Sequence, residues 1–176
     1  MITPKHYTKG PRKEPISQVI IHTMESQEKP DTAESVAKWF AGDTSPKSSI
    51  HWCVDNNSTV MCLRDEDIAW HSGVWEVNLR SLGLELAGTA SQTVKQWHDP
   101  YSNQELRRAS KIVAAWCDLY DIPARHLTIE QVRKGEKGIC GHADVTLAYE
   151  VHGGHTDPGK NFPWVEFIDM VKGWLG

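Results

Sequence analysis

The order of apolar and polar positions predicts the strands of a buried sheet. Residues 17–22 (SQVIIH) form a short apolar run rich in β-branched side chains, which is typical of a central strand. Residues 81–88 (SLGLELAG) alternate, so that three leucines face one way and Glu85 faces the other way among small residues. Residues 50–54 and 59–63 are shorter apolar runs joined by the turn sequence DNNS, and we expect them to form a hairpin.

Apolar residues at helical spacing mark three longer segments, 33–42, 103–121 and 163–175. The second is the longest, and Ser102 is its expected N-cap. A shorter helical turn is expected within 128–135. The residues expected to face the core are Val36, Trp39 and Phe40 in the first segment, Leu106, Ala109, Val113, Trp116 or Cys117, and Tyr120 in the second, and Trp164, Phe167, Ile168, Val171 and Trp174 in the third.

Size and composition favour one domain. The 176 residues show no shift in composition and suffice to bury a core, which predicts a single α/β or α+β domain over 1–176. Residues 1–15, rich in Pro, Lys and Gly, are expected to lie on the surface as an arm. The net charge of −4 provides no broad basic field, which disfavours nucleic acid or an anionic membrane as a partner. The N-terminal residues lack the apolar core of a signal peptide and no apolar run is long enough to span a bilayer, so we expect a soluble product made in the cytoplasm.

The stretch 138–159 concentrates candidate metal ligands between two Gly-rich turns. Its imidazoles and carboxylates are His142, Asp144, Glu150, His152, His155 and Asp157. These ligand types suit zinc, although their spacing fits no helical motif such as HExxH, and a solvated surface loop is the alternative interpretation. A further ligand must come from elsewhere. His22 ends a predicted strand, where sites in α/β sheets are built, although a histidine there is more often structural. Glu85 is, by alternation alone, more often an ordinary solvent-facing strand residue.

Five short motifs in one order resemble a known family. They are IIHTME around His22, AWHSG around His71, SLGLELAG around Glu85, GICGHADV around His142 and HTDPG around Asp157. Together, from about residue 17 to residue 174, they resemble the zinc-dependent N-acetylmuramoyl-L-alanine amidases, which share a fold with phage lytic amidases and animal peptidoglycan-recognition proteins. The resemblance implies a central mixed β-sheet flanked by helices, with a zinc site at one end of a surface cleft.

The resemblance also implies roles for individual residues. His22, His142 and Asp157 fall on the three zinc ligands, which would leave the fourth tetrahedral position for water. Glu85 falls where relatives carry a catalytic glutamate that moves a proton from the attacking water to the leaving amine. His155 stands two residues before Asp157, where many relatives have a lysine that stabilises the oxyanion, and an imidazolium could serve there over a narrower pH range.

Two further departures from the family pattern leave alternatives open. The segment LAYEVHGG lengthens the gap between His142 and Asp157, so His152 competes with Asp157 for the third ligand position. Ile50 stands where some relatives have a catalytic tyrosine, so Glu85 would work without that partner.

The substrate-binding candidates are His71 and the neighbouring Trp70, which belong to a motif lining the cleft in relatives, with Trp75 and Asn78 in the loop that follows. Loop packing is the alternative for these residues.

The expected function is hydrolysis of the amide bond between N-acetylmuramic acid and L-alanine in bacterial peptidoglycan, with Zn²⁺ as cofactor. A monomeric phage endolysin that reaches the wall at lysis fits the missing export signal. A cytosolic amidase that recycles muropeptides fits as well. The alternative from another class is a peptidoglycan-binding module without catalysis, but all three ligand positions hold competent side chains.

Overall fold

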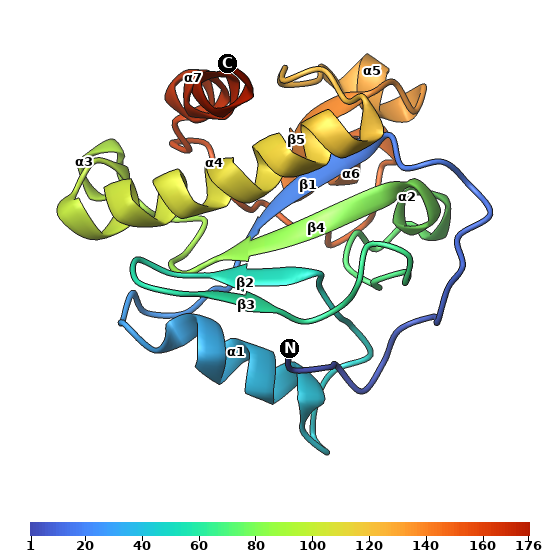
Figure 1. The fold of residues 1–176 in the computed structure, drawn as a ribbon, viewed down its shortest axis with the longest axis horizontal. Coiled ribbons are helices and arrows are strands. Elements are labelled where there is room, and N and C mark those ends of the chain that lie inside the picture. Colours follow the sequence, from blue (N-terminus) through green and yellow to red (C-terminus); the bar gives the residue numbers. More distant parts are fainter.

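A five-stranded mixed sheet runs through the middle of the molecule (Figure 1). The computed structural model describes residues 1–176. The strands are β1 (Gln18–Thr23), β2 (Trp52–Val54), β3 (Thr59–Met61), β4 (Ser81–Leu86) and β5 (Gly138–Gly141), in the order β3-β2-β4-β1-β5. β1 lies parallel to both β4 and β5, β2 is parallel to β4, and β2 and β3 form the expected antiparallel hairpin. The predicted fold class is confirmed.

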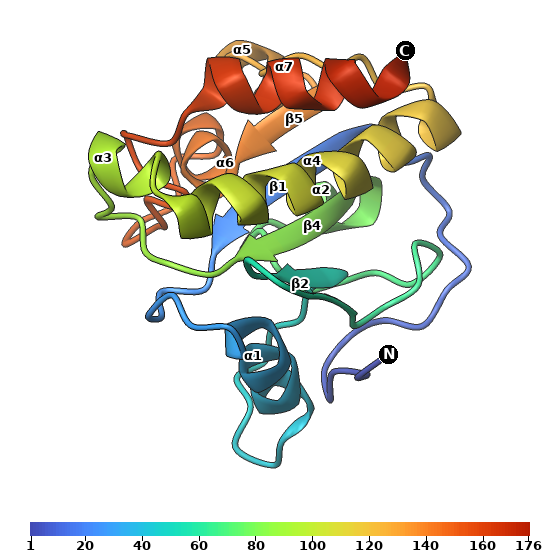
Figure 2. The same cartoon turned by 60° about the vertical axis from the view of Figure 1, so that its left-hand side comes forward.

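Helices cover both faces of this sheet. They are α1 (Thr32–Ala41), α2 (Trp75–Arg80), α3 (Val94–Trp97), α4 (Pro100–Tyr120), α5 (Ile129–Arg133), α6 (His142–Ala148) and α7 (Trp164–Leu175). α4 and α7 pack together on one face, and α1 lies on the far side of the sheet (Figure 2). Buried residues of α2, α5 and α6 also pack on the face away from α4. None of the helices combines the length and the apolar character that a bilayer span requires.

Strand alternation decides which side chains can reach the site. On β4, Leu82, Leu84 and Leu86 belong to the core cluster under α4 and α7. Ile20 of β1 belongs to the cluster on the other face, and His22 shares its parity. His22 and Glu85 are Cα partners in the parallel register, and both lie on the face away from α4.

The structure corrects the predicted start of α4 and the predicted core face of α1. α4 begins earlier than expected, because Asp99 is the N-cap and its carboxylate accepts from the Ser102 backbone N–H at 2.9 Å. Pro100 fits the first turn because that position needs no N–H donor. α1 packs Ala33, Ala37 and Phe40 against the sheet, whereas Trp39 is 51% exposed. Small alanines let the helix approach closely, and Trp39, about 100° around the helix from Phe40, then faces outward.

Some elements were not expected from the sequence. α2 forms in the predicted loop around Trp75 and Asn78, and β5 and α6 form within the stretch 138–159, for which neither a strand nor a helix was predicted. β5 has only four residues, too few to show periodicity, and it exists by pairing with the distant β1. Trp174, expected in the core, is 51% exposed and donates its indole N–H to Ser110 Oγ.

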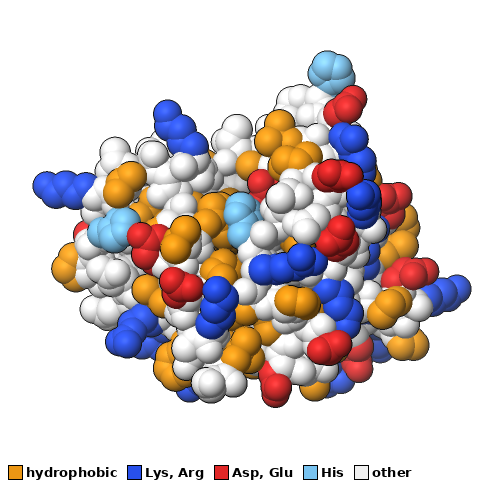
Figure 3. All heavy atoms as spheres, turned by 90° about the horizontal axis from the view of Figure 1, so that it is seen from above, with side chains coloured by type: hydrophobic (Ala, Val, Ile, Leu, Met, Phe, Trp, Pro, Cys, Tyr) orange, Lys and Arg blue, Asp and Glu red, His pale blue; other side chains and the backbone are white.

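The N-terminal segment is fixed to the body through Arg12. Its guanidinium donates to the carbonyl oxygens of Asp65, Asp67, Asn78 and Leu79, at 2.6–3.0 Å. Burial lowers the pKa of Arg12 to about 10, which leaves it charged at neutral pH. On the face drawn in Figure 3, basic and acidic side chains are interspersed with hydrophobic ones.

Candidate metal centre

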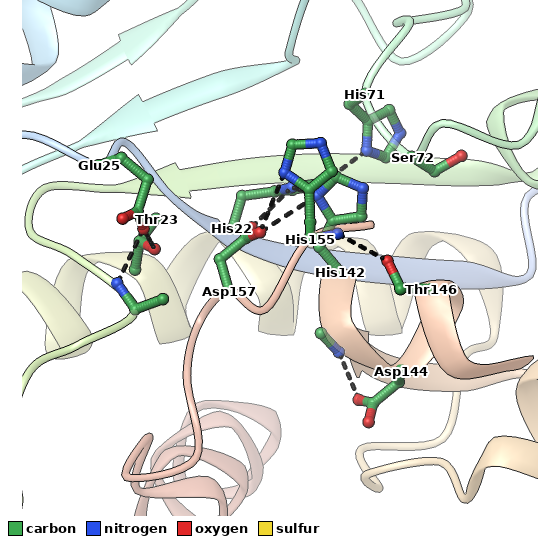
Figure 4. Close-up of polar contacts among 12 residues, drawn as sticks. His22, Thr23, Glu25, His71, Ser72, His142, Asp144, Thr146, His155 and Asp157 are labelled. Carbon is green, nitrogen blue, oxygen red and sulfur yellow. Dashed lines mark hydrogen bonds and ion pairs between the residues drawn. The ribbon is translucent and has the colours of Figure 1, made fainter. Parts of the chain in front are cut away.

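Three buried side chains from distant parts of the chain meet at the carboxyl ends of β1 and β5 (Figure 4). His22 lies near the end of β1, and His142 follows β5 directly as the first residue of α6. Asp157 comes from the loop before α7. Because parallel neighbours end at the same edge of a sheet, β1 and β5 bring the two histidines together although 120 residues separate them.

The spacing of the donor atoms fits a tetrahedral zinc ion. His22 Nδ1 lies 3.1 Å from His142 Nδ1 and 3.2 Å from Asp157 Oδ2, and His142 Nδ1 lies 3.4 Å from Asp157 Oδ1. Zinc bonds of about 2.0–2.1 Å place the corners of a tetrahedron about 3.3–3.4 Å apart. The group formed by His22, His142 and Asp157 could therefore hold a metal ion.

The charge states of this group suit a divalent cation. Burial lowers the pKa of His22 to about 4, so its ring is neutral at neutral pH. Burial acts to raise the pKa of Asp157, but the contacts with His142 and His22 outweigh it and hold that pKa below its ordinary value. A neutral imidazole and an ionised carboxylate are the forms that bind a metal ion.

His152, the competitor for the third ligand position, lies elsewhere. It is exposed and does not belong to the group that could hold a metal ion. The long segment before Asp157 continues α6 and then turns through Glu150, which has a positive φ of 52°, and Gly153, with a φ of 64°. The extra residues are thereby accommodated without displacing Asp157.

Glu85 lies on the wall of the same cavity, on the strand beside His22. Its Oε2 atom is buried and has no hydrogen-bond partner. Burial, together with the nearby charge of Asp157, raises the pKa of Glu85 well above its ordinary value. The structure thus places an unpaired carboxyl group, able to accept and release a proton, in the cavity that contains the three donors.

His155 covers one side of this group. Its ring stacks on His142 with centroids 4.0 Å apart and an interplanar angle of 14°, and its Nδ1 lies 3.5 Å from Asp157 Oδ1. The side chain is 65% exposed. Burial of the rest of the ring, and then the proximity of His142, lower the pKa of His155. This direction disfavours the imidazolium that the sequence suggested for it.

His71 and Asn78, the predicted substrate contacts, are both buried. His71 lies between His22 and Ser81: its Nδ1 is 2.9 Å from His22 Nε2, and its Nε2 is 3.1 Å from Ser81 Oγ. Asn78 Oδ1 accepts from the backbone N–H groups of His71 and Ser72 and from the Ser72 hydroxyl. Both residues line the cavity, yet these polar contacts are to other protein groups.

An open cavity of about 650 Å³ leads to the donor group. Trp39, Trp70 and Trp75 line it together with Lys47. Trp39 was missed, because its helical spacing is equally typical of a core residue. A larger cavity of about 800 Å³, between α4 and the β2–β3 hairpin, contains none of the predicted site residues.

Three protein donors around one point leave room for a fourth, which is the pattern of metal sites that carry out chemistry. With the unpaired Glu85 beside them, this arrangement is typical of an enzyme that uses a metal ion. Comparison with known families narrows this class. The model of the N-acetylmuramoyl-L-alanine amidase family matches residues 12–160, and the chain belongs to this family.

Individual relatives agree with this placement. The chain is 30% identical to N-acetylmuramoyl-L-alanine amidase A of Achromobacter lyticus, over 91% of this chain and 85% of the relative. It is 22% identical to the 1,6-anhydro-N-acetylmuramyl-L-alanine amidase AmpD of Haemophilus influenzae, over 95% and 89% of the two chains. Among solved structures, the hydrolase AmiA of Staphylococcus aureus has the same fold, with a TM-score of 0.67 and 13% identity over 92% of this chain and 73% of that one.

The resemblance inferred from five motifs is therefore confirmed at the level of the family. All three residues that could hold the metal, and Glu85, lie within the matched region. The roles of the individual residues stay predictions.

Proposed function

We propose that the chain hydrolyses the amide bond between N-acetylmuramic acid and the L-alanine of the stem peptide in peptidoglycan, using a zinc ion. Family membership supports hydrolysis of this bond, and both curated relatives are named as amidases of this type. The observation that carries the proposal is the buried group of three donors, 3.1–3.4 Å apart, in an open cavity of about 650 Å³. A non-catalytic binding module would not need these donors.

His22, His142 and Asp157 would hold the zinc ion, with Asp157 offsetting one of its two charges. The bound ion supplies Lewis acidity that polarises the amide carbonyl and activates water. Glu85 would take a proton from the attacking water through its unpaired oxygen and deliver it to the leaving nitrogen of L-alanine, so that the amine departs neutral. His155, at the exposed side of the group, would donate an N–H to the oxygen that becomes negative.

The test is incubation of the protein with purified peptidoglycan, with and without a chelator, followed by detection of new L-alanine N-termini. We expect release with zinc and none with the chelator. No release in zinc-replete buffer would contradict hydrolysis, and retained binding to the wall would then identify a binding module.

Glu85→Gln separates the catalytic role from metal binding. The amide fills the same space but cannot take up a proton, so we expect unchanged zinc content and turnover at least about 10²-fold lower. Full activity of this variant would remove the proposed role of Glu85.

Cleavage of this bond does not by itself identify the biological role, because a lytic enzyme and a recycling enzyme cut the same bond. We propose a monomeric endolysin that degrades intact wall. The AmpD relative carries a name that specifies the anhydro sugar, which makes recycling the second candidate. Activity should be compared on wall sacculi and on soluble anhydro-muropeptides. A strong preference for the soluble substrate would favour recycling, and size-exclusion chromatography tests the monomer.

A further inference from the structure

Both ring nitrogens of His22 contact other side chains: one faces the candidate metal ligands and the other faces His71 (Figure 4). Nδ1 points to the donors of His142 and Asp157. Nε2 lies 2.9 Å from Nδ1 of His71, and the opposite nitrogen of His71 lies 3.1 Å from Ser81 Oγ. All of these side chains are buried, so water does not compete for these contacts.

Only one arrangement of protons satisfies this series of contacts when His22 holds a cation. The lone pair of His22 Nδ1 faces the cation, so the proton of the neutral ring is on Nε2 and is donated to His71 Nδ1. His71 then carries its own proton on Nε2 and donates it to the Ser81 hydroxyl. A single tautomer is thus selected for each ring.

We propose that His71 is a positioning residue, which fixes the tautomer and orientation of His22 for metal binding and does not itself contact substrate. This inference rests on the metal site of the proposed function. His71, the histidine of the AWHSG motif, thereby changes from a candidate substrate contact to a support for His22, because protein groups occupy both of its ring nitrogens.

The surroundings of His71 are built to hold its ring in place. Asn78 Oδ1 accepts from the backbone N–H of His71 at 3.3 Å and from both the N–H and the hydroxyl of Ser72, which fixes the loop that carries the ring. Gly83 of β4 leaves space for the ring, because a Cβ at that position would lie 2.6 Å from His71 Nδ1 and from Ile50 Cδ1. A glycine inside a strand often marks such a close approach.

The cost of losing this contact can be stated in advance. Removal of a hydrogen-bond partner behind a metal-binding histidine typically weakens metal affinity by about 10- to 100-fold. His142 has a different support, since His155 stacks on its ring. Loss of His71 should therefore affect the His22 side of the site alone.

A matched pair of variants tests the hydrogen bond separately from packing. Asn and Leu have nearly the same shape, but only Asn offers an acceptor close to the position of His71 Nδ1. Zinc affinity is measured by competition with a chromophoric chelator. We expect His71→Leu to lose about 10- to 100-fold in affinity and His71→Asn to stay within a few-fold of the parent protein. His98→Leu, an exposed histidine at the end of α3, is the control and should not change it.

Nitrogen-15 spectra of the zinc-loaded protein give a second, independent readout. In the parent protein we expect His22 and His71 each to show a single tautomer protonated at Nε2. Protonation of His71 at Nδ1 in the zinc-loaded parent protein would contradict the positioning role, because His71 could not then accept from His22 Nε2. This readout needs no variant, which keeps the inference testable if His71→Leu fails to fold.

The outcomes are distinguishable. Parent-like zinc affinity in His71→Leu, or equal losses in the Leu and Asn variants, would overturn the positioning role while leaving the amidase proposal intact. Absence of zinc binding by the parent protein would overturn both. A rise in KM at saturating zinc, with zinc affinity unchanged, would return His71 to substrate binding.

Discussion

Zinc should stabilise the folded protein through Asp157. Only the folded chain brings the three donors together, so binding of zinc shifts the unfolding equilibrium. At a free zinc concentration about 100-fold above the dissociation constant, the free energy of unfolding rises by about 2.7 kcal/mol. For a chain of 176 residues, each kcal/mol moves the melting temperature by about 2–4 °C, which gives an expected shift of about 5–11 °C.

Asp157→Ala should remove most of this shift. The variant loses the only anionic donor and leaves two imidazole nitrogens 3.1 Å apart to hold the ion. Each protein is melted with zinc and with a chelator, and only the difference is compared, so that the variant's own stability cancels. His152→Ala is the matched control and should keep the full shift, because His152 lies outside the group. A lost shift in His152→Ala together with a retained shift in Asp157→Ala would refute the ligand assignment.

Three further predictions concern stability and substrate affinity. Gly83→Ala should lower the free energy of unfolding, measured in urea, by about 1–3 kcal/mol, because its Cβ would overlap the ring of His71. Gly173→Ala, in the last turn of α7 where a Cβ meets no other atom, should not lower it, and equal effects of the two substitutions would contradict the packing argument. Burial raises the pKa of Glu105 well above its ordinary 4.5, so stability that is present below the unfolded value is lost as the pH rises through the folded pKa. Glu105→Gln should therefore gain stability relative to the parent protein as the pH rises above the ordinary carboxyl pKa, measured by urea unfolding, and a difference that does not change with pH would argue against the shifted carboxyl. Trp39→Ala should raise KM for peptidoglycan with little change in kcat, and an unchanged KM would place this exposed tryptophan outside the substrate path.

The sequence predicted best those elements whose burial is visible in a single segment. β1 is apolar over most of its length because helices cover both of its faces, and β4 alternates in a way that separates its leucines from Glu85. The apolar stripe of α4 was likewise predictable from the spacing of its apolar residues. These patterns are set by the local environment of each strand or helix, so periodicity reveals them.

Features that depend on distant partners could not be predicted in this way. β5 is four residues long and is a strand because β1 offers a parallel partner. Trp39 has the spacing of a core residue, and only the docking of α1 through alanines turns it to the cavity. The contact of His71 with His22 joins residues 49 positions apart, and the one local sign of it was a glycine inside a strand.

The site depends on the order and register of three strands. Because β1 lies between β4 and β5, it places His22 beside Glu85 on one side and beside the start of α6, with His142, on the other. Side chains alternate along a strand, so a slip of β4 by one residue would turn Glu85 into the core under α4 and bring a leucine to the cavity. The apolar packing of Leu82, Leu84 and Leu86 excludes that slip. The hydrophobic pattern that builds the core is thus also what places the acid next to the metal-binding group.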